Sequence, residues 1–140
     1  LSNSDAGSHA AARAVSRNHT ESMQVHANVP RRDYLGLMKA ADVIVGNSSS
    51  GLIEAPTYKL PAVNVGNRQR GRLQGENVIN VGYVENDIVN AIKKAMSPQF
   101  KKRLKNIKNP YGDGRSSKRI VEVLATIPID EKLLVKRISY

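Results

Sequence analysis

Short apolar runs alternate with amphipathic stretches along most of this chain. Mostly apolar, β-branched runs predict strands at residues 42–45, 60–65 and 78–81, and a shorter strand is predicted at residues 23–26. The run at 42–45 is followed at once by a turn and carries no charge after Asp42. That pattern predicts a strand buried on both faces.

Between these runs, apolar residues recur at helical spacing. This spacing predicts helices at residues 9–17, 31–41, 52–58, 85–96, from 98 to about 107, and from 116 onward. The dense turn signal at 109–114 separates the last two, and the stretch 130–140 alternates charge with leucine, which predicts a tail helix.

Two of the predicted helices carry a clear apolar face. In the helix at 85–96 we expect the buried face to consist of Ile88, Val89, Ile92 and Met96. In the last core helix we expect Ile120, Val121 and Leu124 to point inward.

Strands that alternate with helices predict an α/β fold, a Rossmann-like parallel sheet with helices on both faces. In such sheets ligands bind at the carboxyl ends of the strands. The loops at 46–51 and 66–75 both follow strands, so we expect them at one edge and in one binding site. Because no apolar strand precedes Asn3, we also expect the chain to be part of a longer protein.

The loop Gly46-Asn47-Ser48-Ser49-Ser50-Gly51 is the strongest candidate for a binding site. Its small residues leave backbone N–H groups and hydroxyls at a predicted helix start, which together favour a phosphate or diphosphate. An ordinary serine-rich N-cap is the alternative.

Two charged residues accompany this loop. Glu54 is expected in the first turn of the following helix, where a carboxylate close to phosphates suits a neutral ribose diol better than the phosphates themselves; a favourable charge at a helix start is the alternative. Arg68 lies just after a strand end and supplies a cation for phosphates or a planar stack for a base.

Composition narrows the function classes. The formal net charge of +10 favours an anionic partner. Without Trp and with one Phe, the chain lacks an aromatic platform for single-stranded nucleic acid. No apolar run is long enough for a signal peptide or a membrane span, so we expect a cytoplasmic protein without a membrane partner.

No catalytic set is recognisable. His9, His19 and His26 lack metal-ligand spacing, cysteine is absent, and no G-x-S-x-G elbow occurs. We therefore expect no metal and no cofactor, and the catalytic residues are unassigned.

Five motifs occur along the chain in this order: Asn3-x-Asp5-Ala6-Gly7-Ser8, Gly46-Asn47-Ser48-Ser49-x-Gly51-x-x-Glu54, Pro61-x-Val63-Asn64-x-Gly66-x-Arg68-Gln69-x-Gly71-Arg72, Gly75-Glu76-Asn77-Val78 and Tyr111-Gly112-Asp113-Gly114. Together, in matched order and spacing, they resemble one family, the UDP-N-acetylglucosamine 2-epimerases. The resemblance covers nearly the whole chain, is to the carboxy-terminal half of these enzymes, and is specifically to the hydrolysing branch that feeds sialic acid synthesis.

The resemblance implies a GT-B fold, of which residues 1–140 would be a single partial UDP-binding domain with a tail helix at 128–140. The amino-terminal catalytic domain would be absent, and the full enzyme would be a homo-oligomer. It further implies six residues that contact UDP: Ser48 and Ser49 at the diphosphate, Glu54 at the ribose, Arg68 at the nucleotide, the backbone of Val29 at uracil, and Asn3 close to the nucleotide.

The activity implied is elimination of UDP from UDP-N-acetylglucosamine, followed by addition of water with inversion at C2, which yields N-acetylmannosamine and UDP. One alternative keeps the fold but changes the chemistry, to a GT-B glycosyltransferase or a non-hydrolysing epimerase. A second is a basic nucleic-acid-binding module, favoured by charge but lacking a recognisable motif. A third alternative is a purely structural domain, which does not explain why the serines, Glu54 and Arg68 match the motifs of the family.

Overall fold

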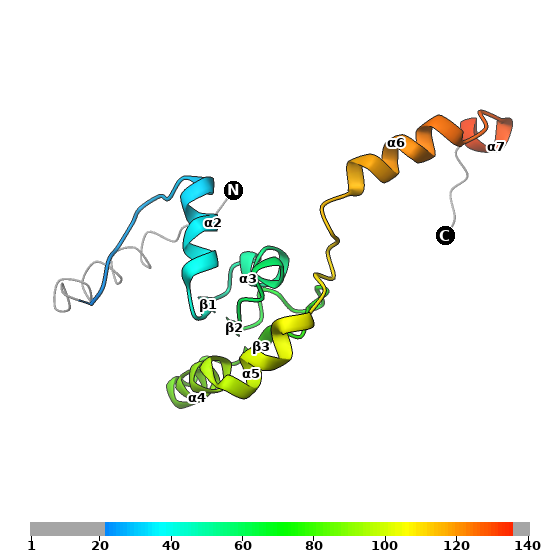
Figure 1. The fold of residues 1–140 in the computed structure, drawn as a ribbon. Coiled ribbons are helices and arrows are strands. Elements are labelled where there is room, and N and C mark those ends of the chain that lie inside the picture. The colour runs from blue at the N-terminus through cyan, green and yellow to red at the C-terminus, as the bar shows by residue number, and fades with distance from the viewer. Residues whose placement is uncertain (1–21, 136–140) are drawn as a thin grey trace. The chain divides into compact units, whose positions relative to one another are not determined.

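The computed structural model describes residues 22–135, which belong to two compact units divided between Ala40 and Ala41 (Figure 1). The prediction of one partial domain over 1–140 stays a prediction. In the first unit, helix α2 spans Arg31–Ala40 as its apolar spacing predicts, and Met38 is its buried residue. The predicted helix at 9–17 lies outside the described residues.

The strand predicted at residues 23–26 is wrong, because these residues form no strand in the structure. A strand exists through hydrogen bonds to a neighbouring strand. A short apolar pattern does not reveal whether such a neighbour is present.

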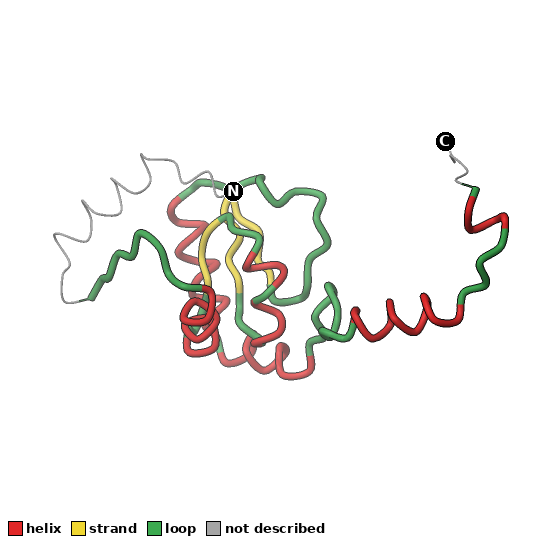
Figure 2. Tube along the Cα trace, turned by 90° about the horizontal axis from the view of Figure 1, so that it is seen from above, coloured by secondary structure: helices red, strands yellow, loops and turns green. Residues whose placement is uncertain are grey.

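The second unit is built on a three-stranded parallel sheet in the order β1-β2-β3, whose strands lie side by side (Figure 2). Strand β1 spans Ile44–Gly46, β2 spans Ala62–Val65 and β3 spans Val78–Val81. Val45, Val63 and Ile79 are partners across the sheet. The three strand predictions and the parallel sheet are confirmed.

Helices connect and follow the strands. They are α3 (Ser50–Ile53) with the 3-10 turn η1 (Ala55–Tyr58), α4 (Glu85–Met96), α5 (Pro98–Arg103) with the 3-10 turn η2 (Leu104–Asn106), α6 (Ser116–Thr126) and α7 (Glu131–Leu134). Ser97 begins α5, since its hydroxyl accepts a hydrogen bond from the Phe100 N–H at 3.2 Å. Helix α7 matches part of the predicted tail helix.

Alternate residues of β2 face different helices. Val63 packs with Ala91 and Ala95 of α4 in one buried cluster. Its neighbour Ala62 faces α3, where a Cβ built on Gly51 would lie 3.3 Å from the Ala62 Cβ. Because successive side chains of a strand point to opposite faces, α3 and α4 cover different faces of the sheet. This confirms the prediction of helices on both faces.

The buried face predicted for α4 is only partly right. Ile92 packs against the core, but Val89 is 39% and Met96 46% exposed, and the fully buried residues are Ala91 and Ala95. Small side chains allow the helix to approach the valines of the sheet closely. The helix is therefore rotated toward its alanines, away from its largest apolar residues.

Strand β1 is not buried on both faces, contrary to the prediction. Ile44 is half-buried and Val45 is 44% exposed. Among the strands of residues 22–135, only β2 has a neighbouring strand on each side, and β1 lies at the edge of the sheet that they form. An uncharged β-branched run does not distinguish an edge from a centre.

Helix α6 forms as predicted, but its apolar side is exposed. Ile120 is 57%, Val121 64% and Leu124 70% exposed, so the predicted inward face is wrong for the described part of the chain. Its start is held by Asp113, whose carboxylate accepts hydrogen bonds from the Arg119 guanidinium at 2.7 and 3.0 Å and from the Arg115 N–H. These bonds hold the pKa of the Asp113 carboxyl below its usual range.

The predicted turn at 109–114 is confirmed, and its side chains hydrogen-bond to α3, to η1 and to the loop after β2. The Asn109 amide donates to the Ile53 carbonyl and to the Thr57 hydroxyl, both at 2.8 Å. The Tyr111 hydroxyl donates to the Leu73 carbonyl at 2.8 Å. In this structure the turn therefore shapes the loop after β2.

One buried side chain joins α3 to the sheet. Asn77 is fully buried, and its Nδ2 donates to the Gly51 carbonyl at 3.0 Å and to the Leu60 carbonyl at 3.1 Å. Its own backbone carbonyl accepts from the Ala62 N–H at 2.8 Å. The start of β2, the start of β3 and helix α3 therefore meet at this residue.

We predict that Leu104→Ala lowers the free energy of unfolding by about 2–5 kcal/mol, because it empties a fully buried site. Leu124→Ala removes the same atoms from an exposed position and should change it by less than about 0.5 kcal/mol. Urea unfolding followed by circular dichroism measures both. Equal effects would contradict the burial assigned to α6.

We predict that Asn77→Asp destabilises the fold by about 3–5 kcal/mol at neutral pH, because a buried carboxylate would face two carbonyl oxygens. Burial would raise the folded-state pKa of this carboxyl, so the loss should be absent below its unfolded-state pKa and should grow as pH rises toward the folded-state value. Asn106→Asp, at an exposed position, is the matched control. A pH-independent loss in urea titrations would argue against this reading.

Candidate functional site

Two loops meet at the carboxyl edge of the sheet. One follows β1 and contains residues 46–51; the other follows β2 and continues to residue 77. The Gln69 side chain, 2% exposed, links them by donating from Nε2 to the Asn47 carbonyl at 2.6 Å. The predicted meeting of these two loops is thereby confirmed.

The serines of the first loop lie around the start of α3. The Ser48 hydroxyl is exposed, accepts from the Ser50 N–H and donates to the Ser50 hydroxyl, both at 3.3 Å. Ser49 is the half-buried N-cap residue, yet its side chain makes no capping hydrogen bond. The N-cap alternative for this hydroxyl therefore has no support in the structure.

The helix that follows is shorter than the sequence predicts. The apolar pattern predicts one helix at 52–58, but the structure has the four-residue helix α3 and then the turn η1. Aligned peptide dipoles add up only over a continuous helix. Hydroxyls and cations, more than a helix dipole, are thus available to hold an anion here.

Glu54 does not lie in the first turn of the helix, which corrects that prediction. It is half-buried, ends α3 and begins η1. The carboxyl end of a helix carries partial negative charge, so the helix dipole of α3 does not stabilise a carboxylate there. The alternative explanation of Glu54 as a charge that favours a helix start is therefore wrong for α3.

The second loop starts at a glycine that no other residue replaces easily. Gly66 has φ +81°, and a Cβ there would collide with the Tyr83 ring. Arg68, two residues later, is exposed. The Gln69–Asn47 hydrogen bond brings its loop against the loop of Ser48 and Ser49.

Sequence reasoning missed the buried carboxamides around these loops. Asn64, Gln69 and Asn77 are 4%, 2% and 0% exposed. Asn64 interrupts an apolar strand, and a polar residue at a predicted core position is the signal that identifies it. Gln69 and Asn77 lie in a polar loop, where the pattern carries no such signal.

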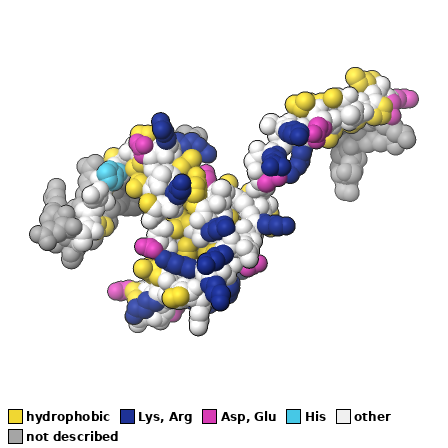
Figure 3. Space-filling view, viewed as in Figure 1, with side chains coloured by type: hydrophobic (Ala, Val, Ile, Leu, Met, Phe, Trp, Pro, Cys, Tyr) yellow, Lys and Arg dark blue, Asp and Glu magenta, His cyan; other side chains and the backbone are white. Residues whose placement is uncertain are grey.

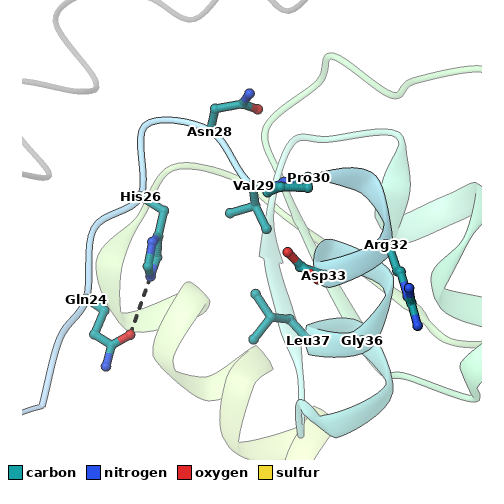
Figure 4. Close-up of a pocket in the computed structure, with 9 residues that line it drawn as sticks. All are labelled: Gln24, His26, Asn28, Val29, Pro30, Arg32, Asp33, Gly36 and Leu37. Atoms are coloured by element: carbon teal, nitrogen blue, oxygen red, sulfur yellow. Dashed lines mark hydrogen bonds between the residues drawn. The ribbon is translucent and has the colours of Figure 1, made fainter.

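The first unit has its own pocket, of about 660 Å³, next to α2 (Figure 4). Val29 and Leu37 line it with apolar surface, and the His26 ring contacts the Gln24 side chain at 3.4 Å. Val29 thus lies in the first unit, whereas Ser48, Ser49, Glu54 and Arg68 lie in the second. Asn3 lies outside the described residues.

Positive charge is widespread on the second unit. Figure 3 shows Lys and Arg side chains spread over one face, with fewer acidic side chains among them. Lys101 is paired with Asp42, which holds the pKa of that carboxyl below its usual range. Within residues 22–135, no cluster of His, Asp and Glu is arranged to hold a metal ion, and no helix is long and apolar enough to cross a membrane.

Comparison with known proteins gives concordant matches. The family model for UDP-N-acetylglucosamine 2-epimerase matches residues 1–125. A UDP-N,N'-diacetylbacillosamine 2-epimerase (hydrolyzing) from Legionella pneumophila is 34% identical over 99% of this chain and 36% of its own length. A GDP/UDP-N,N'-diacetylbacillosamine 2-epimerase (hydrolyzing) from Campylobacter jejuni is 45% identical over 53% of this chain and 19% of its own length.

The fold agrees with a solved structure. The UDP-GlcNAc 2-epimerase from Methanocaldococcus jannaschii superposes with a TM-score of 0.63 at 22% identity, over 81% of this chain and 31% of that protein. The chain thus spans about a third of the length of the Legionella and Methanocaldococcus proteins. Because the family model matches residues 1–125 and the Legionella enzyme is similar over 99% of this chain, the chain belongs to the UDP-N-acetylglucosamine 2-epimerase family.

Proposed function

We propose that this chain is the UDP-sugar-binding part of a hydrolysing 2-epimerase, with UDP seated across the loops at 46–51 and 66–77. The observation that supports it most is the direct link between these loops, the Gln69–Asn47 hydrogen bond, since both loops lie within the residues that the family model matches. The strand ends of a parallel sheet are also where such folds bind ligands.

In this proposal each side chain contacts a different part of the nucleotide. Ser48 and Ser49 donate hydrogen bonds to the diphosphate, and the exposed Arg68 adds a cation. Glu54, at the end of α3 and the start of η1, accepts from the ribose hydroxyls. Val29 and Asn3 complete the proposed set, at uracil and close to the nucleotide.

The reaction we propose for the whole enzyme has two steps. UDP leaves from C1 as a proton is lost from C2, and water then adds across the resulting double bond with inversion at C2. With UDP-N-acetylglucosamine as substrate, the products are N-acetylmannosamine and UDP. Proton transfer is assigned to groups outside this chain, so the chain alone should bind UDP without turning substrate over.

A second substrate has a specific observation in its favour. Two relatives, at 34% and 45% identity, are named for UDP-N,N'-diacetylbacillosamine. The same loops would hold the same UDP, and only the sugar would differ. We further propose a cytoplasmic homo-oligomer for the whole enzyme, with the amino-terminal domain closing the other side of the cleft.

The first test is a nuclear magnetic resonance titration of this chain with UDP, with uridine and phosphate as controls. Shifts near residues 48–54 and Arg68 that are larger for UDP than for either control are the expected result. Binding that ignores UDP and falls steeply with salt would favour the nucleic-acid alternative instead. Absence of binding both here and in a chain extended by its upstream domain would contradict the proposal.

We predict that Ser49→Ala weakens UDP binding by about 1–2 kcal/mol, the scale of a hydrogen bond to a charged acceptor. The fold should be unaffected, since the hydroxyl caps no helix. Ser117→Ala, at an exposed position in α6, is the control and should leave the dissociation constant unchanged. Equal affinities for all three proteins would remove Ser49 from the site.

A further inference from the structure

A separate pocket of about 300 Å³ lies between the crossover loop after β2 and the ends of β2 and β3. Four carboxamides and one cation provide its functional side chains: Asn64, Asn67, Gln74, Asn80 and Arg70. Gly66 and Gly71, both with positive φ, also line it and add no side chain. None of the residues proposed to contact UDP lines this pocket.

Three of the carboxamides form a hydrogen-bonded chain with one buried end. Asn64 Nδ2 donates to Asn80 Oδ1 at 2.8 Å, and Asn80 Nδ2 donates to Gln74 Oε1 at 2.7 Å. Asn64 and Asn80 are register partners in adjacent strands, which keeps the first of these bonds in place. The chain therefore ends at Asn64, the most buried of the three.

The buried end of this chain lacks a partner. Asn64 is 4% exposed, and its Oδ1 makes no hydrogen bond within the described part of the protein. If all three amides rotate by 180°, the bonds between them are kept and an N–H of Asn64 becomes the unpaired group instead. In either direction one buried polar group is unsatisfied, which is unfavourable until a ligand or water pairs with it.

The charge of the lining indicates the ligand. Arg70 is the only charged residue among those that line the pocket, and no carboxylate faces it there. A guanidinium in a carboxamide pocket complements an oxyanion, since both supply N–H donors. An oxyanion would also select the direction of the chain in which Asn64 presents an N–H.

We propose that this pocket binds a small oxyanion, a carboxylate or a phosphate, through Arg70 and the Asn64 carboxamide. The site shares the loop at 66–77 with the proposed UDP site, but its lining includes none of the residues proposed to contact UDP, and the inference does not rest on the proposed function. Its volume is at the lower end of the range for small-molecule pockets, which suits a ligand of a few heavy atoms up to a small sugar acid or phosphate.

The test uses the side-chain amide signals of Asn64, Asn80 and Gln74 in ¹⁵N-labelled protein. Sodium phosphate and sodium acetate are titrated separately at constant ionic strength, with neutral N-methylacetamide as a third probe. Saturable shifts of these signals with phosphate or acetate support the proposal, and the tighter of the two identifies the class of oxyanion. Absence of saturation with both, or stronger binding of N-methylacetamide, overturns it.

Matched variants test the residues. Arg70→Gln should weaken oxyanion binding by about tenfold or more, the effect of losing a charged hydrogen bond, whereas Arg72→Gln, which does not line the pocket, should change it less than about twofold. Asn64→Asp places a negative charge at the buried end and should abolish binding. If Asn64→Asp also disturbs the backbone spectrum, the comparison of Arg70→Gln with Arg72→Gln, both at exposed positions, decides alone whether the pocket binds the oxyanion.

Two further measurements separate this site from the UDP site. Ser49→Ala should leave oxyanion affinity unchanged, and saturating UDP should not displace the oxyanion from the Asn64 signal. Displacement by UDP would overturn the claim of a separate site. If oxyanion binding is seen while UDP binding is absent both in this chain and in the chain extended by its upstream domain, the proposed function fails and this inference stands.

Discussion

The second unit depends on the pairing of Asn77 with two backbone carbonyls, those of Gly51 and Leu60. Gly51 belongs to a helix of only four residues, and Leu60 precedes the central strand. Asn77 reaches both carbonyls from a fully buried position, where a polar group left without a partner is costly. By satisfying both, Asn77 sets the position of α3 against β2, and with it the position of the serine loop that begins α3.

Much of this architecture was accessible from the sequence because it follows from periodicity. The runs that became β2 and β3 and the spacing that became α2, α4 and α6 depend on local pattern alone. The predictions that failed concern the burial of individual side chains. Val45, Val89 and Leu124 look alike as apolar residues, and only tertiary packing decides that each of them is exposed. The same limit explains the strand wrongly expected at 23–26, where the pattern was present and no strand formed.

The residues of the candidate site were predictable from the sequence, but the hydrogen bonds and the helix length that arrange them were not. Small residues after a strand indicated the first loop, and the glycine and arginines indicated the second. Pattern could not show that Gln69 ties the loops together or that the helix after the serines is short. The short helix changes the electrostatics of the proposed site, because binding of an anion there would depend on side-chain donors, which substitution can remove one at a time.

The connection from β2 to β3 has an unusual construction with a consequence of its own. Parallel strands are commonly joined through a helix, but residues 66–77 contain only turns and loop, fastened at Gln69, Leu73 and Gln74 by single side-chain hydrogen bonds. Loop-closure entropy rises only with the logarithm of length, so doubling such a segment costs about 0.6 kcal/mol. Insertions in this connection would be inexpensive for the sheet and would change only the rim of its carboxyl edge, where the proposed ligand site lies. A change in the length of this one loop would therefore alter the proposed site and leave the core as it is.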